Sequence, residues 1–175
     1  ISDVPSVVVT LTVTDINNNT STCTATVTVE DNVDPTAVCR DVTVSLDASG
    51  NGSTTASDVN NGSSDACGIS TLSLSQTAFT CTDVPSVVVT LTVTDINNNT
   101  STCTATVTVE DNVDPTAVCQ DVTVSLDATG NGSTTASDVN NGSSDACGIS
   151  TLSLSQTAFT CTDVPSVVEI GRAHV

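Results

Sequence analysis

The 175-residue chain has 20 acidic residues against two basic ones, a formal charge of −18. It therefore lacks the clustered Lys and Arg that binding to nucleic acids and anionic membranes requires. Met, Trp and Tyr are absent and only two Phe are present, whereas Val and Thr are abundant, which favours strands over helices. Thr or Asp interrupts every apolar run well before the ~18 residues that a membrane-spanning helix needs, so no membrane insertion is predicted.

A repeat of 80 residues organises the chain. Residues 1–80 and 81–160 differ only at Ile1/Cys81, Ser2/Thr82, Arg40/Gln120 and Ser49/Thr129. The Asp-Pro and Asn residues of 110–115 predict a turn or linker. A boundary there gives the C-terminal part of one repeat at 1–33, a complete repeat at 34–113 and the N-terminal part of the next repeat at 114–168.

Within the complete repeat, alternating β-branched residues predict short strands at 37–39, 42–46, 53–56, 69–74, 87–94 and 101–109. Residues 47–52 and 95–99 are rich in Asp, Asn and Gly, which suits turns because Gly and Asn tolerate positive φ. Six or seven short strands in about 80 residues favour an all-β fold of the immunoglobulin-like sandwich type.

The last seven residues leave the repeat pattern. Residues 169–175, Glu-Ile-Gly-Arg-Ala-His-Val, resemble the translation of a common sequencing adapter. We therefore treat them as an artefact at the end of a metagenomic fragment and exclude them from fold and function. The exclusion removes His174, the only histidine, and Arg172.

Several segments carry a family resemblance. They are Asp-Pro-Thr-Ala-Val-Cys at 34–39, Ser-Asp-Ala-Cys-Gly at 64–68, Val-Thr-Asp-Ile-Asn-Asn-Asn at 93–99 and Thr-Cys-Thr-Ala-Thr-Val-Thr-Val at 102–109. Together they resemble the hyalin repeat (HYR), an extracellular immunoglobulin-like module, in the form found in repeat arrays of bacterial surface and adhesin-like proteins. The similarity extends over residues 1–168. It implies a stalk or cell-adhesion module without catalytic residues.

Each complete repeat contains four cysteines, here Cys39, Cys67, Cys81 and Cys103. No Cys-x-x-Cys pair is present, which argues against zinc and favours disulfides over free buried thiols. Three connectivities are open. We favour Cys39 with Cys103, joining the first strand to the last, and Cys67 with Cys81, closing the central loop; the resemblance to hyalin repeats supports the first pair.

The next repeat has the corresponding cysteines Cys147 and Cys161, for which the same central pairing is expected. Small domains with few aromatic residues need such staples, because their cores cannot comfortably offset the entropy of ordering the chain. Disulfides also imply an oxidising compartment. The predicted location is therefore secreted, extracellular or at the cell surface.

Acidic segments recur in every repeat and are candidate calcium sites, because calcium prefers carboxylate and carbonyl oxygens. The junction between repeats offers Glu110, Asp111 and Asp114, equivalent to Glu30, Asp31 and Asp34. A weaker candidate set is Asp95, Asn97 and Asn99, which lacks the Gly and the distal Glu of an EF-hand. A third segment is 58–65. The alternative in each case is a solvated turn, for which Asp and Asn are the ordinary residues.

Two functional hypotheses from different classes remain. One is a structural spacer, whose partners are the neighbouring repeats of the same chain; the other is a calcium-dependent adhesion module with a cell-surface ligand. Between 34–80 and 114–160 the copies differ only at positions 40 and 49 and their equivalents, which favours the spacer because a binding module diversifies its loops. No enzyme is expected, since no base accompanies Ser, Thr or Cys once His174 is excluded.

The two incomplete repeats predict an association between chains. The favoured partners of Cys23 and Cys119 have no counterpart in this chain. Residues 1–33 and 114–168 are complementary parts of one repeat. We therefore expect head-to-tail pairing that can continue into oligomers.

Overall fold

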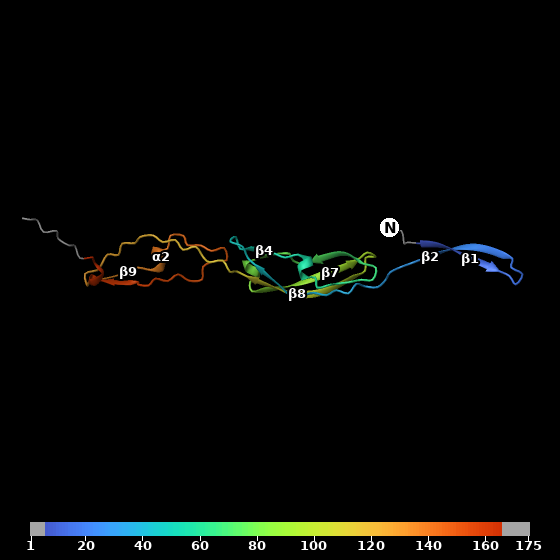
Figure 1. Ribbon diagram of the computed structural model, residues 1–175. Helices are drawn as coiled ribbons and strands as arrows, with labels where there is room; N and C mark the ends of the chain where they lie inside the picture. Colours follow the sequence, from blue (N-terminus) through green and yellow to red (C-terminus); the bar gives the residue numbers. More distant parts are fainter. Residues whose placement is uncertain (1–5, 166–175) are drawn as a thin grey trace, which may run out of the picture. The chain divides into compact units, whose positions relative to one another are not determined.

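The computed structural model describes residues 6–165, and strands make up most of its regular structure (Figure 1). The strands are β1 (Ser6–Thr14), β2 (Thr20–Thr28), β3 (Val42–Ser45), β4 (Asn51–Ser53), β5 (Ile69–Leu74), β6 (Ala78–Thr80), β7 (Ser86–Asp95), β8 (Thr100–Glu110), β9 (Asn131–Ser133) and β10 (Ala158–Thr160). The helical elements are single turns, α1 (Ala56–Val59), η1 (Cys81–Asp83), α2 (Ala136–Val139) and η2 (Cys161–Asp163). The predicted all-β class is confirmed.

In the described part of the chain, no helix is long and apolar enough to cross a membrane. The expected artefact at 169–175, with His174, lies outside the described residues. The described residues form two compact units. The first consists of 6–43, 53–77 and 86–108, and the second of 44–52, 78–85 and 109–165.

The largest sheet has the strand order β3-β8-β7-β5. Its centre is the antiparallel hairpin of β7 and β8, which pairs Ser86 with Thr108, Leu91 with Cys103 and Thr94 with Thr100. The turn closes because the Asp95 carboxylate accepts hydrogen bonds from the backbone and side-chain nitrogens of Asn99, both at 2.7 Å. Asn98 supplies the positive φ of 73° that the turn requires.

The hydrophobic core follows the alternation of Val and Leu with Thr in this hairpin. Successive side chains of a strand point to opposite faces, so Val89, Leu91 and Val93 are fully buried while the Thr residues between them are partly exposed. Buried hydrophobic residues are Val44, Leu46, Val59, Phe79, Val89, Leu91, Val93, Ala105, Val107 and Val109. The core is thus built from aliphatic side chains around one phenylalanine.

The strand predictions for the complete repeat are confirmed at 42–46, 69–74, 87–94 and 101–109 to within a residue or two at each end. The prediction at 37–39 is wrong: this segment makes only isolated bridges, such as Cys39 with Asn60. At 53–56 the strand ends at Ser53, and Ala56 begins α1. The helix starts there because Thr55 and Asp58 form a reciprocal capping box, which satisfies otherwise unpaired N–H groups.

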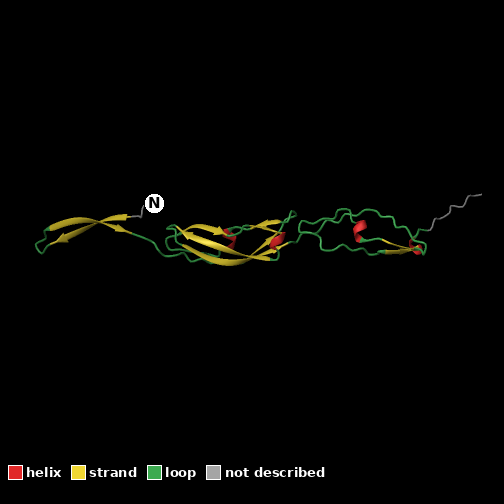
Figure 2. Cartoon of the chain, turned by 180° about the vertical axis from the view of Figure 1, so that it is seen from behind, coloured by secondary structure: helices red, strands yellow, loops and turns green. Residues whose placement is uncertain are grey.

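Regions of identical sequence adopt different structures. Hairpin β1–β2 repeats the sequence and the register of β7–β8, and Figure 2 shows it as a pair of strands. Every residue of β1 and β2 is nevertheless exposed. Residues 131–163 form β9, α2, β10 and η2, the counterparts of β4, α1, β6 and η1. By contrast, residues 122–125 and 149–154, the counterparts of β3 and β5, form no strand.

Candidate functional site

Two disulfides are formed. Cys39 bonds to Cys103, with a Cα–Cα distance of 5.8 Å, as predicted. Cys81 bonds to Cys147, with a Cα–Cα distance of 5.2 Å. Cys67 and Cys161 carry free thiols. The predicted pairs Cys67–Cys81 and Cys147–Cys161 are therefore wrong.

The reason lies in the strands between Cys67 and Cys81. A strand advances about 3.3 Å per residue, so the six residues of β5 carry the chain roughly 20 Å away from Cys67. The Cα atoms of bonded cysteines are less than about 7 Å apart. Strand β6 has only three residues and pairs with β4 rather than with β5, so it does not lead Cys81 back. Closeness in sequence was a poor guide to closeness in space.

The Cys81–Cys147 bond connects the complete repeat to the repeat that begins at residue 114. Cys81 opens η1, and a glycine makes room for its sulfur: a Cβ on Gly50 would lie 2.7 Å from Cys81 Sγ and 3.3 Å from Ala146 Cβ. Gly50 also has a φ of +74°, where other L residues are strained. Gly130, with a φ of +80°, lies equally close to the free thiol of Cys161. The glycine therefore accommodates the cysteine side chain whether or not that cysteine is bonded.

The four free cysteines, Cys23, Cys67, Cys119 and Cys161, follow from the 80-residue period. If every repeat uses the two observed pairings, each of these four has its partner at a position that holds no cysteine in this chain. For Cys67 that position is 1, where isoleucine replaces the cysteine found at 81.

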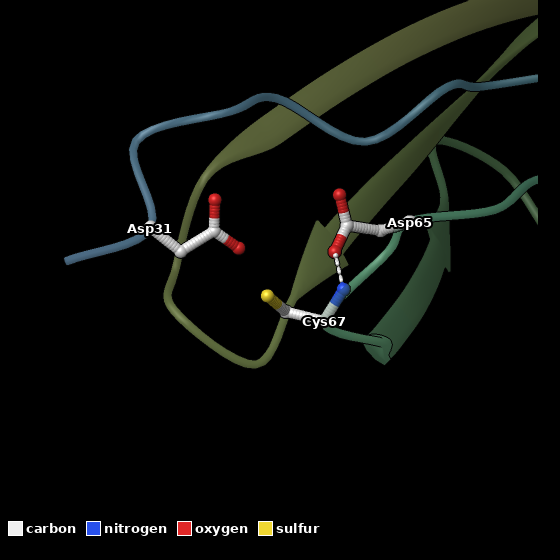
Figure 3. Close-up of side chains that lie close together, drawn as sticks. All are labelled: Asp31, Asp65 and Cys67. Carbon is white, nitrogen blue, oxygen red and sulfur yellow. Dashed lines mark hydrogen bonds between the residues drawn. The ribbon is translucent and has the colours of Figure 1, made fainter. Parts of the chain in front are cut away.

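The carboxylates of Asp31 and Asp65 form a cluster with the thiol of Cys67 (Figure 3). One ligand atom each from Asp31, Asp65 and Cys67 lies within 4.8 Å of the others. Asp65 Oδ1 accepts the backbone N–H of Cys67 at 2.7 Å, which fixes the start of the loop. Asp31 and Cys67 point toward each other, and Oδ2 of Asp31 is buried without a hydrogen-bond partner.

The Asp31 carboxylate alters the chemistry of the thiol. Hydrogen bonding to Asp31, followed by the negative charge of Asp31 and by burial, raises the pKa of Cys67 above its ordinary value. A raised pKa reduces the fraction of thiolate, which is the reactive and metal-binding form. The segment of Asp31 is held in place by Asn99, whose side-chain amide donates to the Asp31 carbonyl at 3.1 Å.

The same cluster recurs one period later as Asp111, Asp145 and Cys147. Here too an Asp145 oxygen accepts the N–H of the cysteine at 2.7 Å. The sulfur of Cys147 is bonded to Cys81, so this copy offers carboxylates but no thiolate. The two copies of the cluster therefore differ in the state of their cysteine, which is free at Cys67 and bonded at Cys147.

The junction residues predicted to bind calcium together are not brought together as one site. Of Glu110, Asp111 and Asp114, only Asp111 belongs to a cluster, and of Glu30, Asp31 and Asp34 only Asp31 does. The two glutamates and the two remaining aspartates are exposed. Asp31 lies beside Asp65, which belongs to the third candidate segment, 58–65. Asp111 lies beside Asp145, for which no role was predicted.

The other acidic segments form local hydrogen-bonded turns. Asp95 is fully buried and both of its carboxylate oxygens accept hydrogen bonds from Asn99, while Asn97 is exposed. Asp58 accepts from the Thr55 hydroxyl and backbone N–H, and these contacts lower its pKa. These carboxylates therefore stabilise turns of the chain through hydrogen bonds to neighbouring residues.

No protein-family model matches this chain, and a search of curated proteins finds no match either.

Proposed function

We propose that the chain is a non-catalytic structural spacer from a secreted or cell-surface protein, built of immunoglobulin-like, HYR-like repeats that are joined covalently to one another. The Cys81–Cys147 bond carries this proposal, because it crosses the boundary between two sequence repeats. A disulfide at such a boundary resists extension of the array, which is the property a stalk needs.

The two bonds shorten the covalent path through the chain. Between Cys39 and Cys147 the backbone has about 108 residues, but the bonds allow a route of about 22 residues through Cys103 and Cys81. An extended residue spans at most about 3.5 Å, so breaking both bonds would release about 300 Å of chain. With both bonds intact, the maximum extension of the spacer therefore stays short even when its strands separate.

Two further observations support the proposal. The complete repeat and its neighbours are almost identical in sequence, as expected when the repeat has to stack rather than to recognise a varied ligand. Disulfides persist in oxidising compartments, which supports secretion or display at the cell surface. A four-stranded sheet and a two-stranded sheet with Greek-key-like crossovers between non-consecutive strands are compatible with an immunoglobulin-like sandwich.

Single-molecule stretching tests the spacer function. The chain is held by its two ends, its free thiols are first blocked with iodoacetamide, and its maximum extension is measured before and after reduction. The expected gain on reduction is about 300 Å. A gain close to zero contradicts the proposal.

A matched variant isolates the bond between repeats. In Cys147→Ser the shortest route from Cys39 to residue 147 becomes about 44 residues, so this variant should extend about 80 Å further than the oxidised native chain. Equal extensions would mean that Cys81 and Cys147 do not carry load between repeats.

Calcium-dependent adhesion is the second candidate, and the buried, unpaired Oδ2 of Asp31 favours it. Asp31 with Asp65, and Asp111 with Asp145, would supply carboxylate oxygens, which calcium prefers to thiols. Calorimetric titration with calcium should then give heat that Asp65→Asn weakens and the control Asp34→Asn leaves unchanged, because Asp34 is exposed and lies outside the cluster. Absence of heat at millimolar calcium would reject this candidate.

A further inference from the structure

Hairpin β1–β2 exposes an apolar face that its identical counterpart buries. Val9, Leu11 and Val13 are 43, 60 and 57% exposed. Their counterparts one period later, Val89, Leu91 and Val93, are each 0% exposed. Val27 on β2 is 44% exposed, against 0% for Val107. An antiparallel hairpin with one apolar face needs another layer to cover it.

A groove in the second compact unit is lined by apolar residues that could cover such a face. It has a volume of about 620 Å³, and its apolar lining includes Val122, Val124, Leu126, Val139, Leu154 and Phe159. One period earlier, the counterparts of four of these residues are the buried core residues Val44, Leu46, Val59 and Phe79. The groove is therefore lined by the residues that surround a hairpin in the complete repeat.

We infer that this groove binds hairpin β1–β2 of a second copy of the chain. Residues 6–28 are identical to 86–108, and the established contacts of 86–108 define the pose. In the complete repeat, β5 pairs with β7 so that Leu74 faces Leu91, and β3 lies beside β8. The corresponding pairs between copies place Leu154 opposite Leu11 of the second copy and residues 122–125 beside its β2.

The polar contacts of the complete repeat can be repeated as well. Asp41 accepts the backbone N–H of Thr106 at 2.7 Å, and Ser75 accepts that of Thr90 at 2.9 Å. Their counterparts in the groove, Asp121 and Ser155, line its wall. On binding, residues 122–125 and 149–154 become strands, because their backbone N–H and C=O groups gain hydrogen-bond partners on the hairpin.

The free cysteines match the same arrangement of copies. The bonds Cys39–Cys103 and Cys81–Cys147, shifted along the array, join Cys119 to Cys23 of the second copy and Cys161 to Cys67 of the second copy. All four free thiols are then used. With glutathione disulfide as oxidant, each pair of thiols loses two protons and two electrons to form one S–S bond, while the glutathione S–S bond is reduced to two molecules of glutathione.

Association is tested first without oxidation. Sedimentation velocity uses the variant Cys23→Ser/Cys67→Ser/Cys119→Ser/Cys161→Ser, which keeps the two observed disulfides and cannot form new ones. Concentrations from about 1 to about 100 μM cover the range in which a micromolar interface passes from free to bound. We expect the average mass to rise at least twofold over this range. Leu11→Asp should abolish the rise, and the control Thr12→Asp, on the opposite face of the same strand, should keep it. A monomer at all concentrations, or equal loss in both variants, overturns the inference.

The register is tested by oxidation of an equal mixture of ¹⁵N-labelled and unlabelled chain with glutathione disulfide. Peptide mapping should show Cys119–Cys23 and Cys161–Cys67, with half of these linked peptides carrying one labelled and one unlabelled partner. Linked peptides without mixed labels mean that the chain closes on itself, and Cys119–Cys67 or Cys161–Cys23 pairs mean a different register. Either result overturns the inference.

Discussion

Hairpins β1–β2 and β7–β8 have the same sequence and the same register, but only one of them belongs to a core. Ser6 pairs with Thr28 as Ser86 pairs with Thr108, and in both turns an aspartate binds the backbone of the asparagine four residues later. The alternating pattern and the turn therefore determine the hairpin locally. Burial depends on residues 37–80, which surround β7–β8.

The C-terminal region gives the converse comparison. At 114–165 the segments that surround a hairpin are present, and α2 keeps the capping box of α1. Phe159 remains partly exposed, whereas Phe79 is buried. Elements whose partners lie within 114–165 form in both copies, including the β9–β10 pair. The counterparts of β3 and β5, which pair with β8 and β7 in the complete repeat, form no strand. The complete repeat is thus a cooperative unit that the isolated parts do not reproduce.

Removing the bond that joins Cys39 to Cys103 should have the largest effect. The double variant Cys39→Ser/Cys103→Ser opens a loop of 64 residues, which costs about 4 kcal/mol of unfolding free energy in the chain-entropy model. Cys23→Ser, at the position equivalent to Cys103, should leave that free energy unchanged. Urea denaturation of both variants measures the difference, and equal stabilities would show that the bond does not stabilise the repeat.

The core comparison predicts a similar contrast for leucines. Leu91→Ala should lower the free energy of unfolding by about 3 kcal/mol, because it removes buried methyl groups and leaves a cavity. Leu11→Ala, at the equivalent exposed position, should change it by less than about 0.5 kcal/mol in dilute solution. Thermal denaturation at low micromolar concentration tests both. Similar losses would mean that β1–β2 is packed like β7–β8.

Gly50→Ala should destabilise the second compact unit more than Gly62→Ala does the first. Both glycines have a positive φ, +74° and +81°, but a Cβ at 62 meets nothing within 4 Å whereas one at 50 meets Cys81 Sγ at 2.7 Å. We expect an excess cost of about 1 kcal/mol or more from overpacking, and a smaller yield of the Cys81–Cys147 bond. Equal effects would remove the argument that Gly50 makes room for the Cys81 side chain.

The smallest expected effect is on the reactivity of Cys67. Because Asp31 raises the pKa of this thiol, less thiolate is present at pH 8 than for an isolated cysteine, and Asp31→Asn should increase the rate of alkylation by iodoacetamide at that pH. The gain should disappear at a pH at which the thiol is fully ionised in both proteins. Asp34→Asn is the matched control; a rate unaffected by Asp31→Asn would contradict the contact.

The strands at 69–74, 87–94 and 101–109 were predictable because alternation of Val, Leu and Thr is a local signal with a direct structural meaning. Helix α1 was missed although Thr55 and Asp58 form a capping box, because the single turn follows a strand without any apolar periodicity. The pairing of Cys81 was not predictable from spacing. It depends on a contact between two repeats, and the interpretation considered pairs only within one.

The candidate calcium site shows the same limit. Asp31 and Asp111 were identified from local charge density, but their partners Asp65 and Asp145 come from a loop 34 residues later in sequence. Exposed carboxylates such as Glu110 and Asp114 repel their neighbours and turn to solvent or to adjacent amides, as Glu110 does toward Asn112 at 3.2 Å. Local charge therefore identified Asp31 and, in a separate segment, Asp65, but could not show that the fold brings them together.

The most direct test of the covalent link between repeats is peptide mapping of the oxidised chain without reduction, after the free thiols have been blocked. Proteolytic fragments should be joined as Cys39–Cys103 and Cys81–Cys147, with the blocking group on Cys23, Cys67, Cys119 and Cys161. Fragments joined as Cys67–Cys81 would confine each bond to one repeat and contradict the proposed spacer.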